Sequence, residues 1–451
     1  MSKGAGVTPI RTRPIVALTD VQQKASALYH EYDLTVDDKG KPFSNADNVL
    51  KVLDNIPQFR DGGLWQDSFR NRPMTDWKCE AGQWREWKDS DDVVLLAYLQ
   101  RQLCWGKLTI TAVQQGLEVF LQNRQHNPLL EWLEGLEWDG TPRVEAFISD
   151  VYGTPRSTYN DSAGRCFLVG LIARAMQPGC QLDTMLILEG KQGLKKSSSL
   201  GVLGGEFYVE LPRDFGGIEF LHDMEGAWLA EIPDMSGFRG RDIEHVKAFI
   251  TLRNDKFRSK YGRRSANHPR HCVFAGTANS NDWLDDPTGG RRFIPIECAE
   301  IDLDYLKANR DQLFAEAVAL YKRVGANVSS SERVSAGADW WVMPETETLQ
   351  EQAARQQEDP WTNPIRAWLK GREIVEINEI ATVCLDISID MVDQRVSRRI
   401  ASVLKKSGYE NKATRTEGKL IKRWRLSVDA SITVADKKQI ELPVTDEGIE
   451  F

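Results

Sequence analysis

The stretch Leu186–Leu203, LILEGKQGLKKSSSLGVL, constrains the fold more than any other part of this chain. An apolar run ends at Gly190, a glycine-containing turn follows, and Lys196 and Ser197 open a segment with helical spacing. Backbone N–H groups in such a turn, together with the N-terminus of a helix, surround phosphate oxygens. The stretch therefore predicts a strand, a phosphate-binding loop and a helix, and with them an α/β domain.

One position departs from the usual loop, because Lys195 stands where a second glycine is expected. A non-glycine residue adopts the backbone conformation of that glycine only with strain. Two interpretations stay open: Lys195 adds a second cation near the phosphates, or it strains the loop and slows turnover. With ATP bound, Lys196 would reach the β- and γ-phosphates and Ser197 would ligate Mg²⁺. The residues expected to contact the nucleotide are Gly190, Gln192, Gly193, Lys195, Lys196, Ser197 and Ser198.

The bulk composition bounds the remaining possibilities. At 451 residues the chain is too long for one ordinary core, so roughly two to four domains are expected. We expect a cytoplasmic protein without a membrane partner, because no apolar run is long enough to cross a bilayer and the first residues lack a secretory signal. The 7 cysteines are scattered without C-x-x-C spacing, which favours reduced thiols. The net charge of -8 argues against polyanion binding over the whole surface.

Changes in hydrophobic pattern divide the chain into five parts. Short apolar strands alternate with helical segments in the middle of the chain, which predicts a three-layer α/β core with a largely parallel sheet. Near the end, helices precede a hairpin, which is typical of a winged-helix module. The expected parts are a flexible N-terminus (1–20), a mainly helical domain (21–155), the phosphate-loop core (156–345), a winged-helix-like DNA-binding domain (346–428) and an acidic tail (429–451).

Further polar residues follow the loop in a consistent order. The strand-like GAWLAEIPDM brings Glu231 to a strand end with Asp234 three residues later, and carboxylates there can hold Mg²⁺ and polarise water. The strand-like CVFAGTANS ends at Asn279, which suits the positioning of water against the γ-phosphate. Arg291 and Arg292 then lie beside a turn and can stabilise charge on that phosphate, from the same or a neighbouring subunit. Each residue alone also fits an ordinary surface; their order favours a nucleotide site.

Two segments are basic although the chain is acidic. Residues 253–270 hold seven basic residues against one acid, with Tyr261 near the expected tip of a hairpin, which suits a single-stranded nucleic-acid backbone with base stacking. Residues 395–425 hold eleven basic residues against two acids. Arg395, Arg398 and Arg399 lie near one another on an expected helix, as would suit duplex phosphates, although a solvated helix explains them equally well.

These pieces resemble the virulence-associated protein E (VapE) family of phages, prophages and genomic islands, whose P-loop ATPase core is similar to superfamily 3 helicases and the AAA+ class. The resemblance covers about residues 126–298 and is most specific in KFRSKYGRRSANHPRHCVFAGTANSNDWLDDPTGGRRFIPI. It gives Lys196 and Ser197 the Walker A roles and Glu231 the Walker B role, with Asp234 as a second carboxylate. Asn279 takes the sensor role and Arg292 is preferred to Arg291 as the arginine finger. The implied DNA contacts are Arg258, Lys260, Tyr261, Arg263 and Arg264.

The resemblance implies an ATP-hydrolysing DNA motor, in the form of a ring-forming helicase, often a hexamer, with single-stranded DNA in a central channel. Glu231 would orient the attacking water, and Lys196 and Arg292 would neutralise charge in the transition state. One alternative is a DNA-binding replication initiator or interference factor with weak or no turnover, which Lys195 and the winged-helix-like end motivate. A nucleotide-dependent switch or kinase without nucleic-acid partners is disfavoured by the two basic segments.

Overall fold

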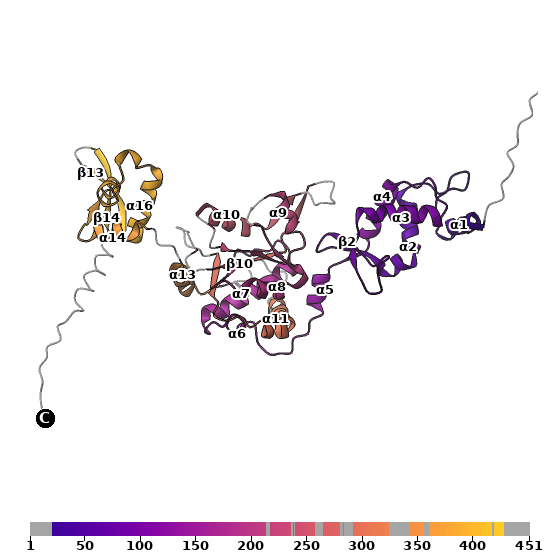
Figure 1. The fold of residues 1–451 in the computed structure, drawn as a ribbon, viewed down its shortest axis with the longest axis horizontal. Coiled ribbons are helices and arrows are strands. Elements are labelled where there is room, and N and C mark those ends of the chain that lie inside the picture. Colours follow the sequence, from indigo (N-terminus) through magenta and orange to yellow (C-terminus); the bar gives the residue numbers. More distant parts are fainter. Residues whose placement is uncertain are drawn as a thin grey trace, which may run out of the picture. The chain divides into compact units, whose positions relative to one another are not determined.

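The chain divides into two compact units. Figure 1 shows the elements of each unit. The first comprises Met1–Asp234, Lys247–Asn279 and Ile294–Pro344, and the second Met235–Val246, Ser280–Phe293 and Glu345–Phe451. The structure, a computed structural model, describes residues 20–212, 217–235, 238, 240–257, 265–279, 283, 292–323, 342–355, 360–416 and 419–427.

A five-stranded sheet in the order β11-β5-β10-β7-β6 forms the centre of the first unit. Its strands are β5 (Met185–Glu189), β6 (Tyr208–Glu210), β7 (Leu229–Ile232), β10 (Val273–Ala278) and β11 (Phe293–Glu297). The pairs β5–β10, β10–β7 and β7–β6 are parallel, and β5, β7 and β10 are buried along their whole length. Because parallel strands end at one edge, the residues that follow β5, β7 and β10 meet there. The α/β core with a parallel sheet is confirmed.

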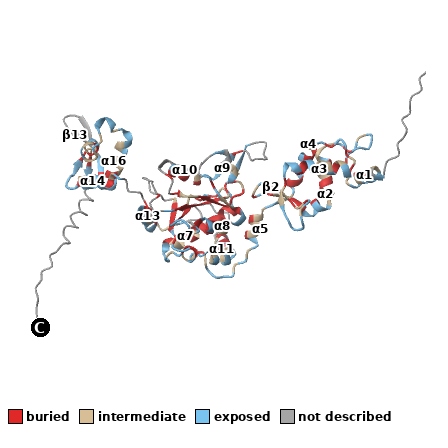
Figure 2. Cartoon of the chain, viewed as in Figure 1, coloured by how far each residue is buried: buried red, intermediate tan, exposed pale blue. Residues whose placement is uncertain are grey.

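Helices cover both faces of this sheet, and buried residues line its strands (Figures 1 and 2). One face carries α7 (Thr158–Met176), α8 (Lys196–Gly204) and α11 (Leu303–Arg323). On the other face lie α9 (Ile218–Asp223) and the end of α10 (Gly240–Ile250), where the ring of Phe249 packs against Phe220 and Phe274 at 5.2 and 5.4 Å. The buried indole of Trp228 donates to the carbonyl of Leu171 at 2.9 Å and so ties the sheet to α7.

Residues 20–126 form helices around a separate core and add a small sheet in the order β3-β2-β1-β4. The helices are α1 (Asp20–Glu31), α2 (Ala46–Asn55), α3 (Asp89–Gln102) and α4 (Ile110–Gln122), and η1 (Phe59–Gly63) leads into the sheet. The strands are β1 (Leu64–Asp67), β2 (Arg72–Thr75), β3 (Arg85–Glu86) and β4 (Gln125–His126). The sequence did not predict this sheet, because strands this short show no alternation of apolar and polar residues.

Two short helices place the start of the core earlier than the sequence suggested. Leu129 on α5 (Pro128–Glu134) and Phe147 on α6 (Phe147–Tyr152) are completely buried in the same apolar cluster as the five-stranded sheet. The expected boundary between residues 155 and 156 therefore differs from the packing, which joins the chain from Pro128 onward to the core. Helical spacing shows that a helix buries one face, but it does not show against which domain.

In the second unit, residues 360–427 form a small domain with its own apolar cluster. Its elements are α14 (Thr362–Leu369), β12 (Ile374–Val375), α15 (Ile377–Glu379) with η4 (Ile380–Cys384), η5 (Ile389–Met391), α16 (Gln394–Lys406), β13 (Tyr409–Thr416) and β14 (Lys419–Leu426); α13 (Glu345–Ala354) precedes them. The three strands form an antiparallel sheet in the order β12-β14-β13. Asp393 caps α16 by accepting from the backbone N–H groups of Arg395 and Val396.

Across the described ranges of both units, every helix is too short or too polar to span a lipid bilayer.

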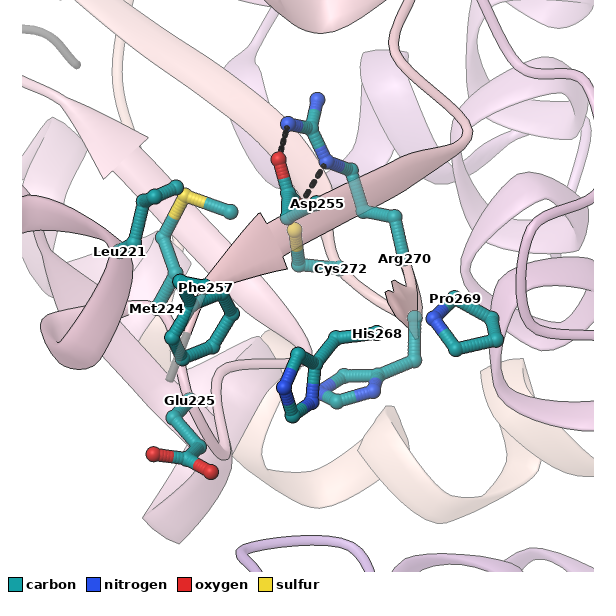
Figure 3. A pocket seen from close by; sticks show the side chains of 10 residues that line it. Leu221, Met224, Glu225, Asp255, Phe257, His268, Pro269, Arg270 and Cys272 are labelled. Atoms are coloured by element: carbon teal, nitrogen blue, oxygen red, sulfur yellow. Dashed lines mark hydrogen bonds and ion pairs between the residues drawn. The ribbon is translucent and has the colours of Figure 1, made fainter. Parts of the chain in front are cut away.

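An antiparallel hairpin of β8 (Asn254–Phe257) and β9 (Ala266–Pro269) leads into β10. At its base the Arg270 guanidinium donates two hydrogen bonds to the Asp255 carboxylate, at 2.8 and 2.5 Å, and lies 4.3 Å from the centre of the Phe249 ring (Figure 3). These two charges of the basic segment therefore neutralise each other inside the fold. The expected DNA contacts between the strands, Arg258, Lys260, Tyr261, Arg263 and Arg264, lie outside the described residues.

A small cavity lies beside this ion pair, with walls of apolar and imidazole side chains (Figure 3). The imidazole of His268 stacks on Phe257 with ring centres 4.2 Å apart, and among the described residues its buried Nε2 has no hydrogen-bond partner. His271 packs on Phe69 of the N-terminal domain with ring centres 4.4 Å apart. Burial lowers the pKa of His271 to about 4, and the positive charge of Arg174 contributes in the same direction.

The folded state should therefore be less stable in mild acid. The unfolded chain takes up the His271 proton near pH 6.5, whereas the folded chain takes it up only near pH 4. We expect the free energy of unfolding to fall by roughly 1–3 kcal/mol as the pH drops through this window. Thermal unfolding of the wild type and of His271→Gln between pH 7 and pH 4.5 measures the effect. Equal pH dependence in the two proteins would rule out His271 as its source.

Candidate phosphate-loop site

The loop between β5 and α8 makes a turn in which two glycines have left-handed backbone conformations. Gly190 and Gly193 have positive φ angles of 137° and 89°, and the N–H of Gly190 donates to the carbonyl of Ala278 at 3.2 Å. A Cβ at Gly190 would lie 2.7 Å from the side chain of Leu194 and 3.1 Å from the carbonyl of Cys298. Glycine is therefore required at Gly190 by both its conformation and its neighbours.

Lys195 occupies the left-handed backbone region, at φ 65° and ψ 28°, directly before α8. Its carbonyl accepts the N–H of Ser199 at 3.0 Å, within the first turn of the helix, and its side chain is exposed. The left-handed conformation costs a non-glycine residue roughly 1–2 kcal/mol. The loop thus keeps the turn of a glycine while carrying a lysine, so the strain considered from the sequence is present in the fold.

The Lys196 ammonium is buried inside the loop and is held by oxygen atoms. Nζ donates to the carbonyls of Gly190 and Lys191 at 2.6 and 3.0 Å, and lies 3.5 Å from Oδ1 of Asn279 at the end of β10. Burial lowers the pKa of Lys196, while the neighbouring Cys298 and Glu231 oppose this shift. A phosphate oxygen would offer the ammonium a charged acceptor in place of the loop carbonyls.

Glu231 is completely buried on β7, and three hydroxyl groups satisfy its carboxylate. Ser197 Oγ and Thr277 Oγ1 donate to Oε1 at 2.7 and 2.9 Å, and Tyr208 OH donates to Oε2 at 2.5 Å. Because the proton of Ser197 points to Glu231, its lone pairs remain for a cation. A hydroxyl backed by a carboxylate is a donor set that fits Mg²⁺.

Thr277 and Tyr208 are site residues that the sequence did not predict. Thr277 lies two residues before Asn279, and that spacing on a strand places two side chains on one face. This signal could have identified Thr277. Tyr208 lies on β6, and no motif in the sequence connects it with Glu231.

Asp234 and Asn279 complete the cluster. The backbone N–H of Asp234 donates to Thr277 Oγ1 at 3.4 Å, and Nδ2 of Asn279 lies 3.5 Å from Oδ1 of Asp234. Asp234 is half-buried and has a positive φ of 52°. Such backbone strain concentrates at functional sites. The fold therefore brings Lys196, Ser197, Glu231, Asp234 and Asn279 together at one edge of the sheet.

The other expected site residues differ in their exposure. Gln192 and Ser198 are exposed in the loop and the first turn of α8. Arg292 is half-buried and belongs to the second unit, whereas Arg291 lies outside the described residues. Arg395 and Arg398 are exposed on α16. The Arg399 guanidinium lies 3.7 Å from the centre of the Trp361 ring, so Arg399 takes part in packing.

Two further observations bound the chemistry of this edge. The described part of the chain holds no cluster of three or more His, Cys, Asp or Glu side chains that could bind a metal. A cation beside Ser197 and Glu231 would therefore draw its other ligands from water and phosphate, as Mg²⁺ commonly does. The cavity near His268 adjoins the start of β10, roughly 20 Å from Asn279 along the strand, and is separate from this edge.

Comparisons with known proteins agree with the resemblance seen in the sequence. No curated protein matches the chain in sequence. The similar solved structures include two of the apo A form of the NrS-1 C-terminal region. Both are 11% identical, with TM-scores of 0.42 and 0.41; they cover 85% and 84% of this chain and 100% and 99% of their own. At these TM-scores the likeness identifies no function. The virulence-associated protein E-like domain matches residues 133–359, half of the chain, and the chain belongs to this family.

Proposed function

We propose that this protein is an ATP-hydrolysing DNA motor of a phage or mobile genetic element, in the form of a ring-forming replicative helicase. The observation that carries the proposal is the hydrogen-bonded set around Lys196 and Glu231 at the carboxyl edge of a parallel sheet. Its members lie at the carboxyl ends of β7 and β10 or directly after β5, three strands that are adjacent in space but far apart in sequence. Membership of the virulence-associated protein E-like family supports the same assignment.

The topology supports a nucleotide site at this place. The strands beside β5 are β10 and β11, whereas the chain that leaves β5 through α8 reaches the far edge strand β6. The connections therefore diverge above the carboxyl end of β5. Ligands of open α/β sheets bind in the crevice that such a divergence creates. The N-terminus of α8 adds backbone donors and a positive dipole for phosphate.

The two carboxylates differ in environment, and this supports a division of roles. Glu231 is inaccessible to solvent and already accepts three hydroxyl protons. It is therefore suited to hold the Ser197 hydroxyl in the orientation that leaves its lone pairs for a cation. Asp234 is half-buried next to Asn279, so water can approach it. We therefore assign the polarisation of the attacking water to Asp234, where the sequence had suggested Glu231. Bound Mg²⁺ would supply charge neutralisation between the phosphates.

The second unit supports DNA binding. Its order of helix, strand, two helices and a hairpin is the order of a winged-helix module, with α16 as the second helix of the helical pair. Arg395 and Arg398 are exposed near the N-terminus of α16, where helix-turn-helix proteins contact DNA. The hexamer, the central channel and the finger role of Arg292 belong to the same proposal. A DNA-binding initiator with little turnover is the second candidate, favoured by the strained backbone of Lys195.

The division of roles predicts different defects in two conservative variants. Asp234→Asn should lower kcat by about 100-fold or more while ATP binding stays close to wild type, because only water activation is lost. Glu231→Gln should lower kcat and also weaken Mg²⁺-dependent ATP binding. Lys196→Ala should abolish both ATP binding and hydrolysis. Steady-state ATPase with and without single-stranded DNA, together with equilibrium binding of a fluorescent ATP analogue, measures these effects. Unchanged turnover in Asp234→Asn would contradict the assignment.

Two substitutions at Lys195 separate strain from charge. Lys195→Gly removes both, and should stabilise the fold by about 1 kcal/mol, because glycine adopts the left-handed conformation without cost. Lys195→Ala removes the charge but keeps the strain, and is the matched control. We expect faster hydrolysis in Lys195→Gly alone, which would identify a brake. Weaker ATP binding in both variants would instead identify Lys195 as a phosphate contact.

DNA binding should depend on the exposed arginines of α16. The double variant Arg395→Ala/Arg398→Ala should weaken duplex binding and reduce the slope of log K against log salt by roughly 2, because two phosphate contacts are lost. Fluorescence anisotropy at several salt concentrations measures the slope. Arg399→Ala is the control: it should lower thermal stability through the lost contact with Trp361 and leave the slope nearly unchanged. An unchanged slope in the double variant would remove α16 from the DNA interface.

A further inference from the structure

We propose that Tyr208 is a positioning residue for the nucleotide site: it fixes the Glu231 carboxylate in the orientation that serves Ser197, and the N-terminal domain holds Tyr208 in place. This inference rests on the proposed nucleotide site. It gives the N-terminal domain a role in that site.

Tyr208 reaches Glu231 diagonally across two parallel strands. In the register of β6 and β7 the partner of Glu231 is Glu210, and Tyr208 pairs with Leu229. The tyrosine side chain therefore extends along the strand to donate its hydroxyl to Oε2 of Glu231. Diagonal neighbours of this kind lie within reach of long aromatic side chains.

The helix that follows the phosphate loop holds the tyrosine in this position. A Cβ at Gly204 of α8 would lie 2.7 Å from Cβ of Tyr208, and a Cβ at Gly201 would lie 3.8 Å from its ring. The glycines therefore let β6 approach the same helix whose first residues are Lys196 and Ser197. The position of the hydroxyl group is set by the element that carries the phosphate-binding residues.

The hydroxyl controls which way the Glu231 carboxylate faces. Oε1 accepts from Ser197 and Thr277, and Oε2 accepts from Tyr208. With a donor on each oxygen the carboxylate cannot rotate without breaking a charge-assisted hydrogen bond. Burial and the negative charge of Glu231 raise the pKa of Tyr208, so the phenol stays protonated and remains a donor at neutral pH.

The residues directly before Tyr208 are held by the N-terminal domain. Glu206 and Phe207 lie in a short helix, η2 (Gly205–Phe207), that runs into β6. The Arg70 guanidinium donates to Glu206 Oε2 at 2.6 Å and lies 4.4 Å from the centre of the Phe207 ring. Phe69 packs edge-on against Phe207 with ring centres 5.1 Å apart.

Arg70 is itself fixed from both sides. The buried carboxylate of Asp67 accepts from Arg70 Nη1 at 3.1 Å. Gly226 approaches so closely that a Cβ there would lie 2.9 Å from Cγ of Arg70. The turn between β1 and β2 is therefore joined firmly to the segment that ends at Tyr208. Three consecutive residues therefore connect the N-terminal domain with Glu231. Glu206 and Phe207 contact the N-terminal domain, and Tyr208 orients the Glu231 carboxylate.

The test uses the full chain and measures how much Mg²⁺ increases its affinity for ATP. Tyr208→Phe keeps the ring and removes only the hydroxyl group. We expect the Mg²⁺ enhancement of ATP affinity to fall roughly 5- to 10-fold, while affinity without Mg²⁺ stays near wild type. The thermal midpoint should fall as well, because Oε2 of the buried Glu231 loses its donor. A packing role alone would change the midpoint and leave the Mg²⁺ enhancement intact, which would overturn the proposal.

The link to the N-terminal domain is tested by a double-mutant cycle. Arg70→Ala should reduce the Mg²⁺ enhancement by a smaller factor, roughly 2- to 5-fold, and should add little in the Tyr208→Phe background, because both act through one hydroxyl group. Arg72→Ala is the matched control, since Arg72 pairs with Glu86 inside the N-terminal domain. Independent, additive effects of Arg70→Ala and Tyr208→Phe would overturn the link.

Measuring ATP hydrolysis by the wild type distinguishes a failure of the Tyr208 proposal from a failure of the proposed motor function. A wild-type protein that binds Mg²⁺·ATP without hydrolysing it contradicts the motor, while the binding cycle still decides the role of Tyr208. A wild-type protein that hydrolyses ATP with an unaltered Mg²⁺ enhancement in Tyr208→Phe contradicts the role of Tyr208 alone. A protein that binds no ATP contradicts both.

Discussion

The edge of the sheet where Lys196, Ser197 and Glu231 meet depends on one buried negative charge. Moving the Glu231 carboxylate from water into the sheet would cost several kcal/mol if its oxygens found no donors. Three separate elements each supply one hydroxyl group: α8 through Ser197, β10 through Thr277 and β6 through Tyr208. The sheet therefore cannot bury this residue without also arranging the groups around it. Assembly of the core and assembly of the site are the same physical event.

Much of this arrangement could be predicted from the sequence, because it is encoded locally. The strand, loop and helix around Lys196 follow one another within a single stretch, and Glu231 and Asn279 each end an apolar run. Parallel strands bring such ends to one edge without further information. The virulence-associated protein E-like family match extends this agreement over half of the chain.

The rest depends on contacts between distant segments, which spacing does not reveal. Tyr208 reaches Glu231 across a strand pair, so neither residue carries a local sign of the other. The sequence places Asp255 and Arg270 in a segment expected to bind nucleic acid, whereas in the fold the two side chains pair bidentately with each other. The helices from Pro128 to Tyr152 look like those before them, and only packing assigns them to the sheet. Lys195 was recognised as unusual, but its left-handed backbone became known only from the fold.

The contact of Arg70 with Glu206 and Phe207 has a practical consequence for dividing the protein into fragments. A core fragment that begins at Pro128 would keep the apolar cluster of the sheet almost whole, losing only Phe69, and would be an obvious choice for expression. It would also lose Arg70 and Phe69, and so would expose the ring of Phe207 directly before Tyr208. Such a fragment would keep Tyr208 and Glu231 but lose the contacts that hold the segment directly before Tyr208. Studies of the proposed nucleotide site therefore belong on a chain that includes the turn between β1 and β2.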